Sequence, residues 1–452
     1  MDKKRFYQKL LPLVFPIAFE QLMYSLVSAS DALMLGLLDQ ASLSAVSLAA
    51  QVQFVFSLFM GGLTGGGNVL VAQYWGRGIT EQVERVYAIL LRYATLAGAV
   101  FSGAALLCPQ LLMRFFTPDP ELIRLGSGYL RIVGITYLCS SINQSNMCIM
   151  RNIGRASRAS LIGSTCVVLN ILFNSILIFG LFGFPKMGVQ GAALATTIAQ
   201  VIGLVWGVIE TRRVGKIRLR RKFLSDFRMP IEKSFWKYTS PMLGNSVAWG
   251  LGITMGSVIL GHLGTDAVAA NSIASVAKNL IACFCMGLAA GGAILVGNEL
   301  GAGKLERAKQ YGSKVVILSL VSGVISGAIL VALTPLILKV AKLSPQSAEY
   351  LRWMIVVCAV NVVGMSHNSA TISGIFSAGG DTKFGFFCDV ITLWGVVVPL
   401  GMLAAFVFNW PVLVVYIVIN MDEIIKLPAV WWNYKKYNWV KDLTEHHSEV
   451  DG

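Results

Sequence analysis

The sequence predicts an all-α membrane protein with twelve transmembrane helices in two pseudo-symmetric six-helix bundles. The 452-residue chain is 55% apolar and only 13% charged, and its mean hydropathy is +0.67. A soluble protein of this length needs more charge to cover its surface, so most of this surface is expected to face lipid. Long apolar runs, one-sided basic residues and an internal repeat then predict the number of helices, their topology and their grouping.

The apolar runs predict the number of helices. About 20 apolar residues are needed to cross a bilayer as a helix. Twelve such runs cover residues 12–37, 46–72, 88–113, 127–150, 160–184, 189–209, 238–261, 268–297, 315–338, 353–376, 386–408 and 411–432. The first run is too long for a signal peptide and has no small-residue cleavage site, so it is expected to remain as a span.

The basic residues predict the topology. The formal charge is +14, and ten Lys or Arg lie between Arg212 and Lys237, against two acidic residues. If the N-terminus is cytoplasmic and twelve spans follow, the other main basic clusters fall on the same side: 3–9, 151–158 and 304–314. This positive-inside pattern places both termini in the cytoplasm of a multi-pass protein of the cell membrane. The basic excess is then topological, and no nucleic-acid partner is expected.

An internal repeat relates the two parts of the chain. The Gly-rich segment 65–78 recurs as 290–303, with six of fourteen positions identical, and Pro16 corresponds to Pro241 in the same alignment. We call this alignment the first register. The segment that begins at Ile149 aligns with the segment that begins at Ile375, which is one position further along, and we call this alignment the second register.

The repeat makes each half six spans long, and an even number makes the halves parallel repeats about the membrane normal. We expect an N-terminal half at 1–211, a basic cytoplasmic linker at 212–237, a C-terminal half at 238–435 and a cytoplasmic tail at 436–452.

Ionisable residues within the spans are functional candidates, because each costs about 3 kcal/mol or more to insert. Glu20 and Asp31 are eleven residues apart in the first span, close to three helical turns, and Tyr24 lies between them on the same face. This arrangement predicts a cation path, with the alternative that Glu20 lies at the aqueous end of its helix. Asp389, Asp422 and Glu423 lie near predicted cytoplasmic ends and are interpreted as structural.

Two further spans carry oxygen ligands. Asn170 and Asn174 share one face of the fifth span, and Thr196 lies in the sixth. Carboxylate, amide and hydroxyl oxygens suit a hard cation such as Na⁺, whereas a proton needs only a carboxylate. Periodicity alone leaves open whether these spans meet. Paired asparagines also occur as hydrogen-bonding links between membrane helices.

The paired Gly-rich segments, the paired proline spans, and Asn170 and Asn174 followed by Thr196 together resemble the multidrug and toxic compound extrusion (MATE) family, of bacterial type, over residues 10–435. The resemblance implies the MATE fold and a Na⁺ or H⁺ site at Asp31, Asn170, Asn174 and Thr196. Some family members also carry acids in the seventh and tenth spans. The corresponding segments here, 240–249 and 366–370, have none, so a second cation site is not expected in the C-terminal half.

The expected function is cation-coupled export of organic, cationic or amphipathic compounds by alternating access. Glu20, Tyr24, Trp249 and Lys278 are candidates for the substrate or proton path. The expected partners are small organic substrates and the lipid bilayer, and the chain is expected to act as a monomer without a cofactor other than its coupling ion.

Three alternatives were weighed. A lipid-linked-sugar flippase of the same superfamily typically has several basic residues in its cavity, but only Lys278 lies deep in a span. A major-facilitator transporter needs a basic motif that loop 76–81 lacks. An intramembrane enzyme is not expected, because a single mid-span histidine, His367, provides no catalytic or metal-binding constellation.

Overall fold

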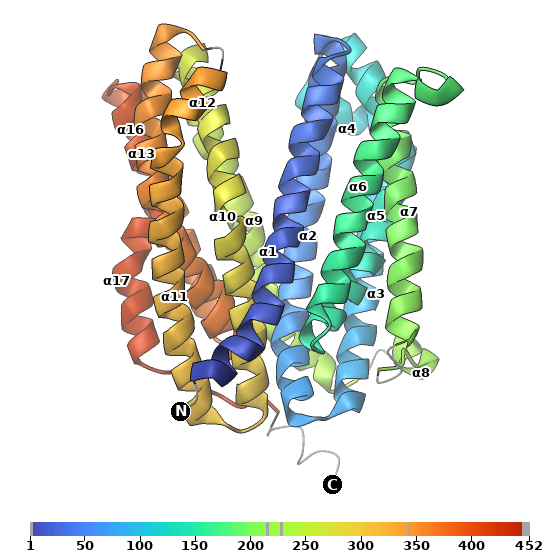
Figure 1. The fold of residues 1–452 in the computed structure, drawn as a ribbon, viewed down its shortest axis with the longest axis vertical. Helices are drawn as coiled ribbons and strands as arrows, with labels where there is room; N and C mark the ends of the chain where they lie inside the picture. The colour runs from blue at the N-terminus through green and yellow to red at the C-terminus, as the bar shows by residue number, and fades with distance from the viewer. Residues whose placement is uncertain (1–2, 214–216, 227–228, 342, 445–452) are drawn as a thin grey trace. The chain divides into compact units, whose positions relative to one another are not determined.

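The computed structural model describes residues 3–213, 217–226, 229–341 and 343–444, and the described chain is helical with no strand (Figure 1). Parts of the predicted linker (214–216 and 227–228) and of the predicted tail (445–452) lie outside these residues. The first half of the chain contains α1 (Lys3–Gly36), α2 (Gln40–Arg77), α3 (Thr80–Leu107), α4 (Pro109–Phe116), α5 (Pro120–Asn152), α6 (Ala156–Phe179), η1 (Leu181–Gly183) and α7 (Val189–Arg213).

The remainder begins with the short helix α8 (Arg221–Ser225). It continues with α9 (Ile231–His262), α10 (Thr265–Gly301), α11 (Leu305–Ala332), α12 (Thr334–Val340) and α13 (Pro345–Asn368). The last spans are built from η2 (Ser369–Phe376), α14 (Thr382–Val390), η3 (Ile391–Val397), α15 (Val398–Met402), η4 (Leu403–Val407), α16 (Val412–Ile419) and α17 (Asp422–Lys435). The segments η2, η3 and η4 are π-helical, a conformation that is often found at functional sites.

Ten helices of the described chain are long and apolar enough to cross a membrane, and they correspond to ten of the twelve predicted runs. The other two runs are also helical. The fourth forms α5, which is long but carries many Ser, Asn and Gln residues. The twelfth is divided at Asn420 and Met421 into α16 and α17. Elsewhere two predicted runs are interrupted, because Pro109 at the first position of α4 and Pro335 in the first turn of α12 start separate helices.

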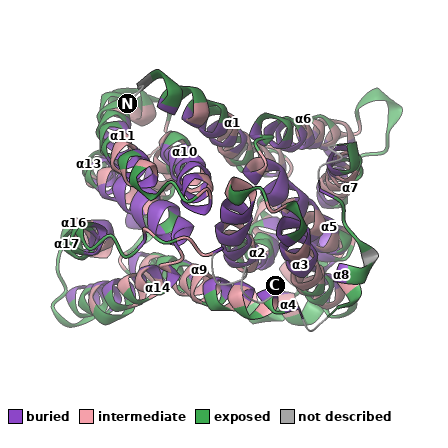
Figure 2. Cartoon of the chain, turned by 90° about the horizontal axis from the view of Figure 1, so that it is seen from below, coloured by how far each residue is buried: buried purple, intermediate pink, exposed green. Residues whose placement is uncertain are grey.

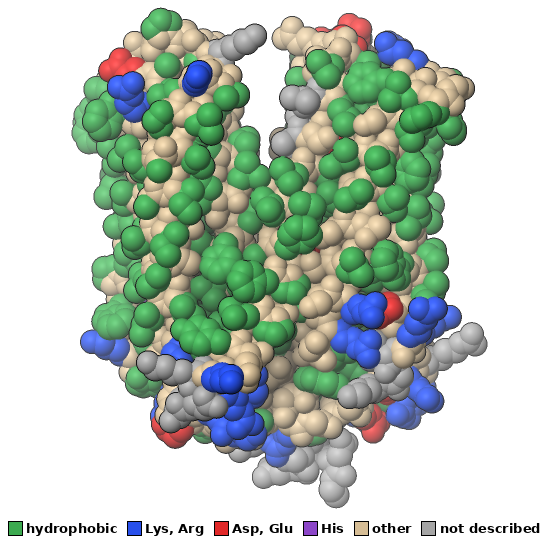
Figure 3. All heavy atoms as spheres, in the orientation of Figure 1, with side chains coloured by type: hydrophobic (Ala, Val, Ile, Leu, Met, Phe, Trp, Pro, Cys, Tyr) green, Lys and Arg blue, Asp and Glu red, His purple; other side chains and the backbone are tan. Residues whose placement is uncertain are grey.

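Charged side chains lie near the ends of the helices, and apolar side chains cover the lengths between them (Figure 3). Apolar side chains cover the length of the helices on the visible face, and Lys and Arg gather near one end of each unit (Figure 3). The predicted linker contributes to one such basic region, where Arg220 pairs with Glu84 at 2.8 Å. The backbone carbonyls of Phe223 and Asp226 there accept hydrogen bonds from Arg92.

The chain forms two compact units, and each is described by itself. The N-terminal unit comprises residues 19–75 and 79–236, and in it α5 packs against both α3 and α7, while α6 packs against α7. The C-terminal unit comprises residues 1–18, 76–78 and 237–452. Its centre is α10, which packs against α11, α13 and η2 and has 18 buried residues among its 37 (Figure 2). The predicted boundaries at 211 and 238 divide the chain by its sequence repeat, whereas the two units are defined by contacts. The boundaries therefore stay a prediction.

The first eighteen residues belong to the C-terminal unit because α10 presents glycine to them. A Cβ at Gly287 would lie 2.6 Å from the Cβ of Ala18, and one at Gly291 would lie 2.9 Å from Cγ2 of Val14. The missing side chains let the beginning of α1 approach α10 closely, as small residues commonly do between membrane helices.

The end of the described chain also packs into the C-terminal unit. Trp439 is fully buried, and its ring stacks on Tyr434 at 5.8 Å between centroids. Arg77 donates hydrogen bonds to Asp442 at 3.0 Å and to Thr444 at 2.7 Å. The segment after α17 is therefore a packed part of this unit.

Gly379→Ala is expected to destabilise the protein, because the added Cβ would overlap the carbonyl oxygen of Trp439. Overpacking of this kind costs about 1–3 kcal/mol. The measurement is thermal unfolding of the purified protein in detergent. Gly261→Ala is the control, since a Cβ there meets no atom within 4 Å, and its stability should match or exceed that of the wild type. Equal stability of the two variants would contradict the packing of Trp439 on Gly379.

Candidate functional site

Four of the predicted site residues come together in the N-terminal unit. The amide nitrogen of Asn174 donates to Oδ1 of Asp31 at 2.5 Å and to Oδ1 of Asn170 at 3.1 Å. The amide nitrogen of Asn170 in turn donates to Oγ1 of Thr196 at 3.0 Å. One hydrogen-bonded chain therefore joins side chains of α1, α6 and α7. Asn170 and Asn174 are four residues apart, so they lie on the same face of α6.

The site is lined by the oxygen atoms of a carboxylate, two amides and a hydroxyl. Asn174 is completely buried, and its Oδ1 has no hydrogen-bond partner among the described residues. A buried polar oxygen without a partner is costly in a membrane, where water does not replace the missing bond. A cation bound beside the Asp31 carboxylate would satisfy this oxygen. These oxygen ligands therefore fit a hard monovalent cation.

A fifth side chain joins the site from α5. Tyr129 packs against the apolar residues beside the site, and its hydroxyl lies near Thr196 and Asp31. We did not predict Tyr129 from the sequence. The only signal for it was the unusual polarity of α5, which identifies no single residue.

Apolar side chains lie one helical turn from the site on each contributing helix. Leu35 follows Asp31, Ile178 follows Asn174, and Ala192 precedes Thr196 by four residues. These residues form one buried cluster with Val46 and Val189, and Tyr129 packs against it. The cluster fixes the mutual positions of α1, α6 and α7, and it borders the polar site with hydrocarbon.

Glu20 lies in the same unit but has a different environment. Its side chain is almost completely buried, and Nη2 of Arg151 lies 2.7 Å from both of its carboxylate oxygens. Gly163 of α6 gives it room, since a Cβ there would lie 2.7 Å from Oε1. Arg151 lies at the end of α5 and belongs to the basic cluster 151–158 that is predicted to be cytoplasmic, so the aqueous end of the helix stays an alternative to a cation path for Glu20. Tyr24, one turn further along α1, is 43% exposed.

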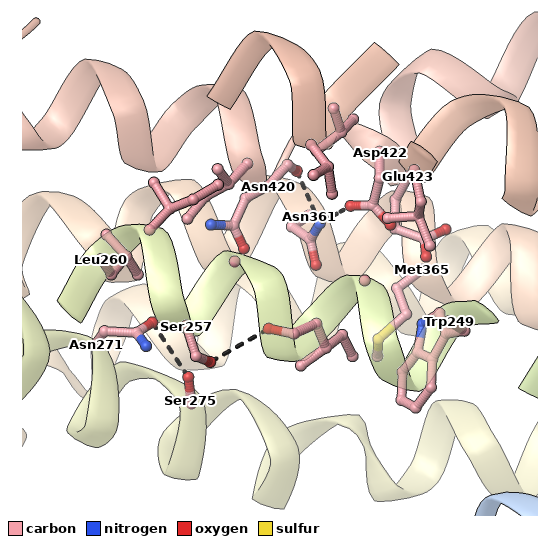
Figure 4. Close-up of a pocket in the computed structure, with 18 of the residues that line it drawn as sticks. Trp249, Ser257, Leu260, Asn271, Ser275, Asn361, Met365, Asn420, Asp422 and Glu423 are labelled. Carbon is pink, nitrogen blue, oxygen red and sulfur yellow. Dashed lines mark hydrogen bonds between the residues drawn. The ribbon is translucent and has the colours of Figure 1, made fainter. Parts of the chain in front are cut away.

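Trp249 and Lys278 lie in the C-terminal unit, where both line a pocket built from α9, α10, α13 and the segments between η3 and α17 (Figure 4). Asp422 and Glu423 also line this pocket. The sequence interpretation had assigned these two acids a structural role near the interface. The candidate path residues are therefore divided between the units, with Glu20 and Tyr24 in one and Trp249 and Lys278 in the other.

Other chemistry is not evident in the described part of the chain. It contains no group of three or more His, Cys, Asp or Glu side chains arranged to hold a metal ion. All eight cysteines are free.

The fold and the oxygen-lined site define a multi-pass α-helical membrane transporter. The MatE family model matches residues 16–176 and again residues 242–403. The first match begins at Pro16 and the second begins directly after Pro241, its counterpart in the first register, so the two matches agree with the internal repeat. The chain belongs to the MatE family, which confirms the resemblance inferred from the sequence.

Individual relatives agree with this assignment. The chain is 24% identical to the "Uncharacterized transporter YisQ" of Bacillus subtilis, over 96% of this chain and 95% of the relative. It is 27% identical to the "Probable multidrug resistance protein NorM" of Rhizobium meliloti, over 88% and 85%. A solved outward-facing multidrug resistance MATE transporter superposes with a TM-score of 0.85 at 18% identity, covering 95% of this chain and 96% of that chain. The predicted fold, twelve helices in two bundles, is thereby confirmed.

Arg151→Met is expected to destabilise the protein, because it leaves the buried Glu20 carboxylate without its counter-ion. Removing one partner of a buried ion pair costs about 3 kcal/mol, measured as lost stability of the purified protein in detergent. The double variant Glu20→Gln/Arg151→Met should recover much of this loss.

Arg155→Met is the matched control. Arg155 is 42% exposed in its side chain and lies 3.6 Å from Glu210, so its loss should cost less than about 1 kcal/mol. If the double variant is no more stable than Arg151→Met, the pair does not stabilise the unit through charge compensation.

Proposed function

We propose that the chain is a Na⁺- or H⁺-coupled antiporter that exports organic, cationic or amphipathic compounds by alternating access. It acts as a monomer in the cell membrane and needs no cofactor besides the coupling ion. The observation that carries the proposal is the hydrogen-bonded group of Asp31, Asn170, Asn174 and Thr196, with a buried amide oxygen left without a partner. The multidrug resistance names of the relatives support organic compounds as substrates. They do not favour the flippase alternative.

Coupling requires that the cation and the solute stabilise different conformations, because a ligand with equal affinity for both conformations shifts no population. Asp31 meets this requirement when its carboxylate binds an incoming cation and the hydrogen bond from Asn174 is rearranged. The rearrangement reaches three helices at once, since Asn174 also contacts Asn170 and Asn170 contacts Thr196. A change at one carboxylate is thereby transmitted to α6 and α7.

Asp31→Asn is expected to reduce ion-driven efflux at least about tenfold, because the amide keeps the shape of the side chain but loses the charge that attracts the cation. The measurement is export of an organic cation from proteoliposomes, driven separately by a Na⁺ gradient and by a pH gradient. The gradient that drives export identifies the coupling ion.

Asp39→Asn is the control for this experiment. Asp39 is exposed, lies in the connection between α1 and α2, and accepts one hydrogen bond from the backbone and one from the hydroxyl of Ser42. In the variant the amide oxygen can accept the backbone bond, and the amide nitrogen can donate to the hydroxyl. The efflux of this variant should match that of the wild type. The antiporter proposal fails if neither gradient drives export of any organic solute and Asp31→Asn changes nothing.

We further propose that both termini are cytoplasmic. Three spans would then precede Cys108, which is exposed at the junction of α3 and α4, and would place it on the outer surface. A membrane-impermeant maleimide should therefore label Cys108 in intact spheroplasts, and Cys108→Ser should remove most of the label. The other seven cysteines are buried or half-buried, so they provide an internal background. Labelling of Cys108 only after the membrane is permeabilised would reverse the proposed orientation.

A further inference from the structure

The C-terminal unit contains a pocket whose walls combine charged, polar and apolar groups. α9 contributes Trp249, α10 contributes Asn271, and Asn361, Asn420 and Asp422 come from α13 and from the region where α16 gives way to α17 (Figure 4). Lys278 of α10 also lines the pocket. Apolar residues of α9 and η3 complete the walls. A concave apolar pocket with a few convergent polar groups is the usual form of a small-molecule site.

The internal repeat relates this pocket to the cation site of the other unit. In the first register Asp31 corresponds to Gly256. Asp422 stands on the last helix of this half. Both Gly256 and Asp422 line the pocket, and a Cβ at Gly256 would meet no atom within 4 Å. The first helix of this half therefore has space where the first helix of the other half has its carboxylate, and the acid of the pocket stands on the last helix.

The positions in this half that correspond to the two asparagines of the cation site are occupied by apolar residues. In the second register Asn170 and Asn174 correspond to Val396 and Leu400. Conversely, Lys278 corresponds in the first register to the uncharged Gln53. The pocket is therefore not a second copy of the cation site, because it has gained a fixed positive charge and lost two amide ligands.

The three carboxylates near Lys426 differ in how closely positive and hydrogen-bonding groups approach them. Lys426 is buried, and its ammonium lies 2.8 Å from Asp389 and 3.0 Å from Glu423. Glu423 accepts a further hydrogen bond from Asn368 at 2.8 Å. Asp422, by contrast, lies 3.5 Å from Lys426 and 3.5 Å from the amide nitrogen of Asn361. Asp422 is therefore the carboxylate that is most available to a ligand.

Lys278 provides the positive charge that faces the pocket together with the carboxylates of Asp422 and Glu423. It is half-buried within the membrane-spanning helix α10 and makes no hydrogen bond or ion pair with the described residues. It is within electrostatic reach of Asp422, yet the two form no ion pair within 4.0 Å. An ammonium at membrane depth without a contacting anion is costly, so an anionic group supplied by a ligand would be strongly favoured there.

We propose that this pocket binds zwitterionic organic solutes. The anionic group of the solute contacts Lys278, its cationic nitrogen faces Asp422, and its ring system packs on Trp249, whose face also attracts cations. A purely cationic solute would face Lys278, and a purely anionic one would face Asp422 and Glu423. The inference rests on the proposed transport of organic solutes and narrows their chemical class.

The test compares two dyes that differ only in the anionic group. Rhodamine 110 carries a free carboxylate and a cationic ring system, and its methyl ester, rhodamine 123, is purely cationic. Binding to the purified full chain in lipid nanodiscs is followed by fluorescence polarisation without any ion gradient. The wild type should bind the carboxylate dye at least about tenfold more tightly than the ester, as expected for one charge-assisted hydrogen bond.

The variants assign this preference to individual side chains. Lys278→Met should abolish the preference by weakening only the carboxylate dye, and Lys278→Arg should retain it. Asp422→Asn should weaken both dyes, because both are cationic. Lys339→Met, an exposed residue of α12, is the control and should bind as the wild type does. Equal affinity of the wild type for the two dyes, or an unchanged preference in Lys278→Met, would overturn the proposal.

This measurement is independent of ion coupling. If the dye preference is observed but no gradient drives efflux, the antiporter proposal fails and the zwitterion pocket stands. If efflux is coupled to an ion but the dye preference is absent, the zwitterion proposal fails and the antiporter proposal stands.

Discussion

In the hydrocarbon region of a membrane, no water replaces a missing hydrogen bond or counter-ion, and the arrangement of polar residues in this protein depends on that constraint. Glu20 lies against Arg151, and Lys426 lies among three carboxylates. Among the described residues, two groups without such a partner lie at the two candidate sites. One is the buried oxygen of Asn174, and the other is the ammonium of Lys278. Each lies where a transported ion or solute would complete the missing contact.

The two halves use the same helices for different chemistry. In the N-terminal half the first helix carries the carboxylate and the fifth carries two amides. In the C-terminal half the corresponding positions are Gly256, Val396 and Leu400, and the acid stands on the last helix. Duplication thus preserved the helix count and the glycine-dependent packing, whereas the polar positions diverged. The consequence is a proposed division of labour, with ion binding in one half and solute binding in the other.

Hydropathy predicted twelve spans, because a bilayer crossing requires a long apolar run, and in the described chain ten of them form helices long and apolar enough to cross a membrane. It described α5 and the α16–α17 pair less well, since α5 is polar along much of its length and the last span is divided at Asn420. Resemblance to a family suggested that Asp31, Asn170, Asn174 and Thr196 belong together. Periodicity places residues on one face of one helix but does not say which helices meet. For that reason Tyr129, the partner Arg151 and the pocket position of Asp422 could not be predicted.

The division of α1 between the two compact units has a consequence for biosynthesis. Residues up to Ala18 pack with the C-terminal unit, on Gly287 and Gly291, although they are the first part of the chain to leave the ribosome. They must therefore remain without their final neighbours until α10 has been synthesised and inserted. The N-terminal unit could assemble while translation continues, but the C-terminal unit could not be completed from its own stretch of the gene alone. A gene divided at the linker would yield a second polypeptide that lacks the opening segment of its own bundle.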